Sequence, residues 1–113
     1  MPASVSVPIE IGTTKGPSIS VIIPTYNCER YVCRAINSIL KQGIVEIQII
    51  IVDDASTDRT VDTIAKKYGT LPNVHIEVQE KNQRQGAARN KGLDIATGKY
   101  VFFLDADDWI DDG

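Results

Sequence analysis

The sequence IQIIIVDD, residues 47–54, decides the fold. Its first six residues are apolar and β-branched except for Gln48. An almost continuous run of this kind is typical of a strand inside a parallel sheet that has helices on both faces. Asp53 and Asp54 follow directly, at the end of the predicted strand. The stretch therefore predicts a buried parallel strand with acidic side chains at its carboxyl end.

Strand-like and helix-like segments alternate on both sides of this stretch. β-Branched or apolar runs indicate the strands, and apolar residues at helical spacing indicate the helices. Asn27 is the expected N-cap of the first helix, and Ser56, Thr57 and Asp58 are the expected caps of the second. In chain order, the predicted elements are a strand at 19–23, a helix between Asn27 and Gly43, a strand at 47–52, a helix between Asp58 and Gly69, a strand at 74–78, a helix at 86–96 and a strand at 100–104.

This alternation, with short connections, implies an α/β fold in which right-handed crossovers join parallel strands into a doubly wound sheet with helices on both faces. With the predicted strands numbered in chain order, the usual arrangement is 3-2-1-4. It places residues 74–78 at one edge, which fits their alternation of apolar and polar side chains. It places residues 100–104 at the other edge, although a strand that is apolar at every position should have neighbours on both sides.

The apolar edge strand has consequences for domain organisation. We expect residues 19–113 to be the N-terminal part of a larger domain, and residues 1–18, which hold three of the five prolines, to be a flexible leader. Unless another segment covers the apolar edge, we expect it to pair with a second copy of the chain as a homodimer.

Composition excludes several classes of protein. The formal net charge is -3, but five of the fifteen acidic residues lie at 105–112, and the rest of the chain is mildly basic. The sequence has no basic face with interleaved aromatic residues, which argues against nucleic-acid binding. Cys28 and Cys33 have no second pair, so they fit neither a zinc site nor a disulfide framework. Because the sequence has no signal peptide and no apolar run long enough for a membrane span, we expect a cytoplasmic chain.

The carboxyl ends of the parallel strands are predicted to meet at one edge of the sheet, where α/β proteins bind ligands. This edge brings together residues 24–27, 53–56 and 105–108. Carboxylates clustered at one edge repel one another and need a counterion. A hard divalent cation, Mg²⁺ or Mn²⁺, prefers oxygen ligands and is commonly held by carboxylates together with substrate phosphates. Asp105, Asp107 and Asp108 are therefore candidate metal ligands, and the alternative is a solvated acidic turn.

Two further features of this edge indicate a ligand. A helix cap needs one carboxylate, whereas Asp53 and Asp54 both precede the cap group, so one of them is expected to accept a hydrogen bond from a ligand. Arg89 lies near the start of the third predicted helix, and the positive N-terminus of a helix favours phosphate groups.

Four motifs resemble those of glycosyltransferase family 2, in the same order. They are VIIPTYN (21–27), IIVDDASTDRT (50–60), QGAARNKG (85–92) and YVFFLDADD (100–108). The resemblance covers residues 19–112. It implies a Rossmann-like GT-A fold whose N-terminal half binds a nucleotide-diphosphate sugar, most often a UDP-sugar, together with Mn²⁺ or Mg²⁺.

The resemblance also implies roles for individual residues. Pro24, Thr25 and Tyr26 would line the base and ribose pocket, and one of Asp53 and Asp54, with Asp54 favoured, would bond the base. Asp105 and Asp107 would occupy the D-x-D positions, and the adjacent Asp108 leaves open which carboxylate binds the metal directly. The residues implied in nucleotide-sugar binding are Pro24, Thr25, Tyr26, Asp53, Asp54, Arg89, Asp105 and Ala106, and those implied in metal binding are Asp105, Asp107 and Asp108.

By the same resemblance, the protein would transfer the sugar to an acceptor hydroxyl with inversion, in polysaccharide or glycoconjugate synthesis. The acceptor would be a glycan, a lipid-linked sugar or a protein, and the parent protein would be cytoplasmic or membrane-peripheral. The catalytic base would come from residues beyond Gly113. This chain is therefore expected to bind the donor without efficient transfer.

The alternative function is that of a non-catalytic nucleotide-binding or interaction α/β module. A receiver domain is disfavoured, because it needs paired acids after the first strand, where this chain has Pro24 and Thr25. A nucleotidyltransferase would need a glycine-rich loop at the same place.

Overall fold

The computed structural model describes residues 9–10, 18–43, 46–81 and 85–106. All seven predicted elements are present, with ends that differ by a few residues. In chain order, the elements are β1 (Ile9–Glu10), β2 (Ile19–Thr25), α1 (Val32–Leu40), β3 (Ile47–Asp53), α2 (Thr60–Tyr68), β4 (Val74–Val78), α3 (Gln85–Ile95) and β5 (Tyr100–Phe103).

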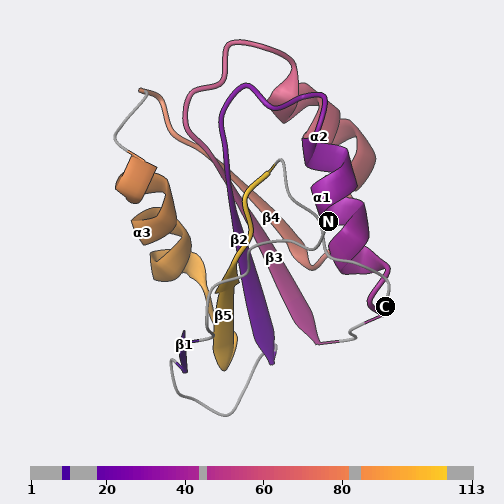
Figure 1. The fold of residues 1–113 in the computed structure, drawn as a ribbon, viewed down its shortest axis with the longest axis vertical. Helices are drawn as coiled ribbons and strands as arrows, with labels where there is room; N and C mark the ends of the chain where they lie inside the picture. Colours follow the sequence, from indigo (N-terminus) through magenta and orange to yellow (C-terminus); the bar gives the residue numbers. More distant parts are fainter. Residues whose placement is uncertain (1–8, 11–17, 44–45, 82–84, 107–113) are drawn as a thin grey trace.

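The strands form one sheet in the order β1-β5-β2-β3-β4. Strands β5, β2, β3 and β4 run parallel, so the predicted 3-2-1-4 arrangement is confirmed. Ile22 in β2 lies opposite Ile50 in β3 and Phe103 in β5, and Thr25 lies opposite Asp53. The carboxyl ends of the parallel strands therefore lie on one side of the sheet, at the top in Figure 1.

Among the described residues, strand β1 is the one element that the sequence analysis does not predict. It lies within the segment expected to be a flexible leader, and it pairs antiparallel with β5, with Ile9 opposite Val101 and Glu10 opposite Tyr100. The apolar edge of β5 is thus covered at these two positions, and the expectation of a bare edge is wrong there. A two-residue strand carries no periodicity that sequence analysis can detect. The homodimer stays a prediction.

Helices cover both faces of the sheet, which explains the continuous apolar run in β3. Helices α1 and α2 lie on one side and α3 on the other (Figure 1). Side chains alternate between the two layers, so Ile49 and Ile51 pack with α1 and α2 while Ile50 and Val52 pack with α3. All four are fully buried. Helix α3 lies close to β2, because a Cβ atom on Gly92 would overlap the side chain of Ile22.

The start of α1 differs from the prediction. The helix begins at Val32, and the preceding Tyr31 makes no side-chain capping hydrogen bond. The expectation that Asn27 caps this helix is wrong, because its side chain instead accepts hydrogen bonds from the loop between β3 and α2. At the start of α2, the N-cap position is held by Arg59, which makes no side-chain capping hydrogen bond, so the expected caps are wrong. Asp58, just before it, accepts a hydrogen bond of 2.9 Å at Oδ1 from the Thr60 N–H, whereas the hydroxyls of Ser56 and Thr57 donate to Asp53 and Asn27.

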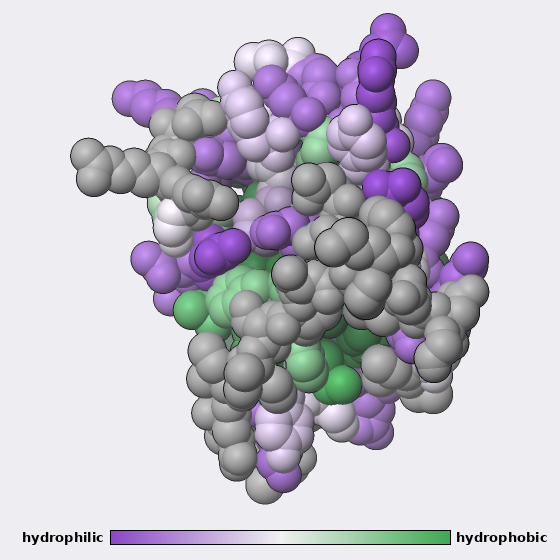
Figure 2. Space-filling view, in the orientation of Figure 1, coloured by the Kyte–Doolittle hydropathy of each residue, from purple (hydrophilic) through white to green (hydrophobic). Residues whose placement is uncertain are grey.

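The surface is polar where the parallel strands end. Figure 2 shows hydrophilic side chains over most of the described upper part of the molecule, and apolar side chains lower down, toward the middle. A polar edge of this kind is suited to a charged ligand. Within the residues that the structure describes, no helix is long and apolar enough to cross a membrane.

Candidate functional site

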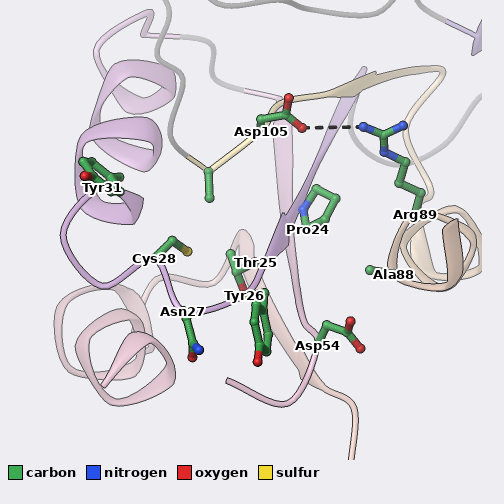
Figure 3. Close-up of a pocket in the computed structure, with 11 residues that line it drawn as sticks. Pro24, Thr25, Tyr26, Asn27, Cys28, Tyr31, Asp54, Ala88, Arg89 and Asp105 are labelled. Carbon is green, nitrogen blue, oxygen red and sulfur yellow. Dashed lines mark ion pairs between the residues drawn. The ribbon is translucent and has the colours of Figure 1, made fainter. Parts of the chain in front are cut away.

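An open pocket of about 460 Å³ lies at the carboxyl end of β2. Its walls come from the loops after β2 and β3, the start of α3 and the segment after β5 (Figure 3). The lining residues are Pro24, Thr25, Tyr26, Asn27, Cys28, Tyr31, Asp54, Ala88, Arg89, Asp105 and Ala106. The ends of three strands and one helix therefore contribute to a single site.

Most of the predicted site residues meet in this pocket. Seven of the eight residues implied in nucleotide-sugar binding line it, and Asp53 does not. Asp107 and Asp108, which the sequence analysis assigned to metal binding, lie outside the described residues. The structure therefore places most of the predicted residues in one pocket. It also distinguishes the two adjacent acidic residues, because Asp54 lines the pocket and Asp53 does not.

Asp53 points into the protein and is fully buried. The hydroxyl of Thr25 donates a hydrogen bond of 2.6 Å to its Oδ1. Ser56 donates two more, from its N–H to Oδ2 at 2.8 Å and from its hydroxyl to Oδ1 at 2.6 Å. Both carboxylate oxygens are thus bonded to the protein itself. Asp53 ties the end of β2 to the loop that follows β3.

Asp54, one residue later, forms part of the pocket wall. Its N–H donates a hydrogen bond of 2.9 Å to the carbonyl oxygen of Thr25, which fixes the backbone at this point. The residue is 8% exposed, so its carboxylate lies in a largely desolvated wall. Hydrogen bonds to a carboxylate in such a place are stronger than in water.

Arg89 and Asp105 form an ion pair at the pocket. Arg89 Nη2 lies 3.5 Å from Asp105 Oδ1 (Figure 3). The two side chains are 43% and 52% exposed, and an exposed pair of this kind contributes little to stability. The guanidinium carbon of Arg89 lies 5.7 Å from the centre of the Phe103 ring, and Arg89 Nε is buried without a hydrogen-bond partner. A ligand in the pocket can therefore replace this ion pair by binding to the guanidinium, to the carboxylate or to both.

Cys28 lines the pocket with an uncharged side chain. Burial raises the pKa of its thiol to about 11, partly offset by hydrogen bonds from the protein. The thiol is therefore protonated at neutral pH, and the reactive thiolate form is scarce. Its backbone N–H donates a hydrogen bond of 2.9 Å to Thr60 Oγ1, which ties the pocket loop to the start of α2.

The described pocket residues supply some of the oxygen ligands that a divalent cation needs. Asp105 supplies an exposed carboxylate at the pocket, and hard cations prefer such oxygens. Among the described residues, there is no cluster of three or more side chains able to hold a metal ion. Any further carboxylate ligand at this point of the chain would come from residues 107 and 108, which the structure does not describe.

Sequence analysis missed Cys28, Tyr31 and Ala88 as pocket residues. Cys28 follows the predicted edge segment directly, so its position in the sequence is a usable signal. Tyr31 returns to the pocket because the chain turns between Cys28 and Val32, where the Cys28 carbonyl accepts the N–H groups of both Tyr31 and Val32. No residue pattern marks that turn.

Comparisons with known proteins identify a family to which the sequence is similar. The family model described as glycosyl transferase family 2 matches residues 20–113. An uncharacterized glycosyltransferase of Nostoc sp. is 50% identical over 90 residues, which is 80% of this chain and 28% of the relative.

Solved structures are similar as well. Staphylococcus aureus TarS in complex with UDP is 39% identical, with a TM-score of 0.75, over 81% of this chain and 28% of that one. The mannosyltransferase PcManGT from Pyrobaculum calidifontis, in complex with GDP-Man and Mn²⁺, is 33% identical, with a TM-score of 0.68, over 83% of this chain and 28% of that one. The likeness to these structures confirms the predicted GT-A fold.

The chain thus spans a little more than a quarter of the Nostoc relative, of the TarS fragment 1–349 and of PcManGT. The match to the family model includes every described residue from 20 onward. By sequence and by fold, the chain belongs to glycosyltransferase family 2.

Proposed function

We propose that the pocket binds the nucleotide part of a nucleotide-diphosphate sugar, with UDP as the preferred nucleotide. The observation that carries this proposal is the combination of Tyr26 and Asp54 in one part of the wall with Arg89 and Asp105 in another. An aromatic ring and a desolvated carboxylate suit a base, whereas a guanidinium and a metal-binding carboxylate suit a diphosphate. The structures of TarS with UDP and with UDP-GlcNAc support the choice of nucleotide.

Each residue then has a separate role. The ring of Tyr26, which is 50% exposed, packs against the base beside Pro24 and Thr25. Asp54 accepts a hydrogen bond from an N–H of the base. Arg89 donates to the phosphates or supports the loop that holds them.

Asp105, together with residues 107 and 108, would hold Mn²⁺ or Mg²⁺ beside the diphosphate. A bound divalent cation stabilises negative charge on a departing diphosphate, which is the chemistry that it supplies to sugar transfer. The GDP-Man and Mn²⁺ complex of PcManGT supports this assignment. The carboxylate of Asp105 would contribute oxygen ligands to such a cation.

For the whole protein, we propose transfer of the sugar to an acceptor hydroxyl with inversion, in polysaccharide or glycoconjugate synthesis. This chain spans about a quarter of the length of the Nostoc relative, and we propose that it binds the donor without efficient transfer. The base that deprotonates the acceptor would then lie outside these 113 residues.

Asp54→Ala tests the base contact. The variant is expected to raise the Kd for UDP about tenfold, which corresponds to the loss of one hydrogen bond to a charged acceptor. Isothermal calorimetry with Mn²⁺ present measures it. Asp62→Ala, which removes an exposed carboxylate in the first turn of α2, is the matched control and should bind UDP normally. If no nucleoside diphosphate binds to the unaltered chain, the non-catalytic interaction module becomes the better interpretation.

Arg89→Gln tests the phosphate contact. The variant is expected to raise the Kd for UDP about tenfold and that for uridine less than about twofold, because uridine has no phosphate for the guanidinium to meet. Competition binding with the two ligands at the same pH and salt measures the difference. Equal losses for UDP and uridine would show that Arg89 acts on the base or on the loop, and would contradict a phosphate contact.

A further inference from the structure

Asn27 connects the two loops that form one wall of the pocket. Its side-chain Oδ1 accepts a hydrogen bond from the Thr57 N–H at 2.7 Å and another from the Asp58 N–H at 3.3 Å. The Asn27 N–H donates in turn to Ser56 Oγ at 2.9 Å. A single residue in the loop after β2 is thus hydrogen-bonded to three consecutive residues in the loop after β3.

The backbone at this junction adopts a conformation that few residues tolerate. Asn27 has a φ of 46°, and Ala55 in the facing loop has a φ of 59°. Asparagine is one of the few residues other than glycine that enter this left-handed region readily. The sequence therefore places at position 27 a residue that fits the backbone turn and also supplies an acceptor for the facing loop.

Tyr26 depends on this junction for its position. The residue is 50% exposed, so packing against other side chains holds it only in part. The residue before it, Thr25, is buried and bonded to Asp53, and the residue after it is Asn27. Figure 3 shows Tyr26 and Asn27 extending from consecutive positions of the loop. The backbone on both sides of Tyr26 is bonded to the segment that follows β3, because the Thr25 carbonyl accepts the Asp54 N–H and the Asn27 N–H donates to Ser56 Oγ.

We propose that Asn27 is a positioning residue that holds Tyr26 in the pocket wall for the nucleotide base. The inference rests on the proposed function for the identity of the ligand, but the holding of the loop does not depend on a ligand. Asn27 also lines the pocket, but in this proposal it acts through the backbone of the loop and not by contact with the base.

Three variants of the chain test the proposal. Asn27→Gly keeps the left-handed backbone and removes the oxygen acceptor. Asn27→Asp keeps an oxygen acceptor for the N–H groups of Thr57 and Asp58. Tyr68→Phe is the control, because it removes a partly buried hydrogen bond of 2.6 Å to Asn37 between α2 and α1, and neither residue lines the pocket.

Two measurements are made on each variant. Amide hydrogen exchange, followed by NMR without nucleotide, should be about tenfold faster at Tyr26, Thr57 and Asp58 in Asn27→Gly than in the unaltered chain. The Kd for UDP, measured by calorimetry, should rise about fivefold to tenfold in Asn27→Gly and less than about threefold in Asn27→Asp and Tyr68→Phe.

The outcomes separate this inference from the proposed function. Unchanged exchange at the Tyr26 amide in Asn27→Gly would overturn the inference, even if Thr57 and Asp58 exchange faster for lack of their acceptor, and so would a loss of UDP affinity in Tyr68→Phe as large as in Asn27→Gly. If the unaltered chain does not bind UDP, the proposed function is wrong. The exchange measurement then decides by itself whether Asn27 holds the Tyr26 loop.

Discussion

Asp53→Ala is expected to lower the free energy of unfolding by about 3–4 kcal/mol. The carboxylate is fully buried and accepts hydrogen bonds from the Thr25 hydroxyl and from the N–H and hydroxyl of Ser56. Alanine leaves the buried Thr25 hydroxyl and the partly buried N–H and hydroxyl of Ser56 without this acceptor, and each unsatisfied buried group costs about 1–3 kcal/mol. The loss is a large fraction of the 5–15 kcal/mol that holds a typical domain together. Urea denaturation followed by circular dichroism measures it.

Two control variants sharpen this experiment. Asp53→Asn keeps one oxygen acceptor and should lose about half as much stability. Asp62→Ala removes an exposed carboxylate from α2 and should unfold within about 0.5 kcal/mol of the unaltered chain. An Asp53→Ala variant that unfolds at the same urea concentration as Asp62→Ala would contradict the role of Asp53 in tying the two loops together.

The different roles of Asp53 and Asp54 show where sequence analysis reached its limit. The apolar run of residues 47–52 predicts the strand and the acidic pair at its end. It does not predict which carboxylate points inward, because that depends on what lies opposite. The register of β2 and β3 places Thr25 opposite Asp53, and the Thr25 hydroxyl then bonds to it. Register is set by the packing of whole strands and by the turns between elements, not by the residues next to the carboxylate.

The same physical reason explains the other differences. The alternation of strands and helices predicts the parallel order, because crossover geometry leaves few alternatives. Asn27 satisfies the local pattern of a helix cap, but the hydrogen bonds that its side chain accepts come from residues about thirty positions later in the chain. Strand β1 arises from two residues whose partners lie in β5. Local patterns predicted the elements well, and contacts between distant segments decided the details of the site.

Removal of divalent cations is expected to raise the Kd for UDP about 100-fold. Among the described residues that line the pocket, two carry carboxylates, Asp54 and Asp105, and one carries a cation, Arg89. The guanidinium already lies 3.5 Å from Asp105, so its charge is partly offset by that carboxylate. A diphosphate group brings several further negative charges to this wall. Arg89 by itself leaves most of that repulsion uncompensated, and the pocket therefore needs a second source of positive charge.

The measurement compares calorimetric titrations of UDP with Mn²⁺ or Mg²⁺ present and with EDTA in its place. Uridine is the matched ligand control, and its affinity should change less than about twofold between the two conditions, because it lacks the phosphates that a cation would bridge. Equal UDP affinity with and without the cation would contradict a metal-assisted site and leave Arg89 as the phosphate-binding group. A uridine affinity that falls together with that of UDP would instead show that the cation holds the pocket in shape, because a ligand without phosphates has no other reason to respond to it.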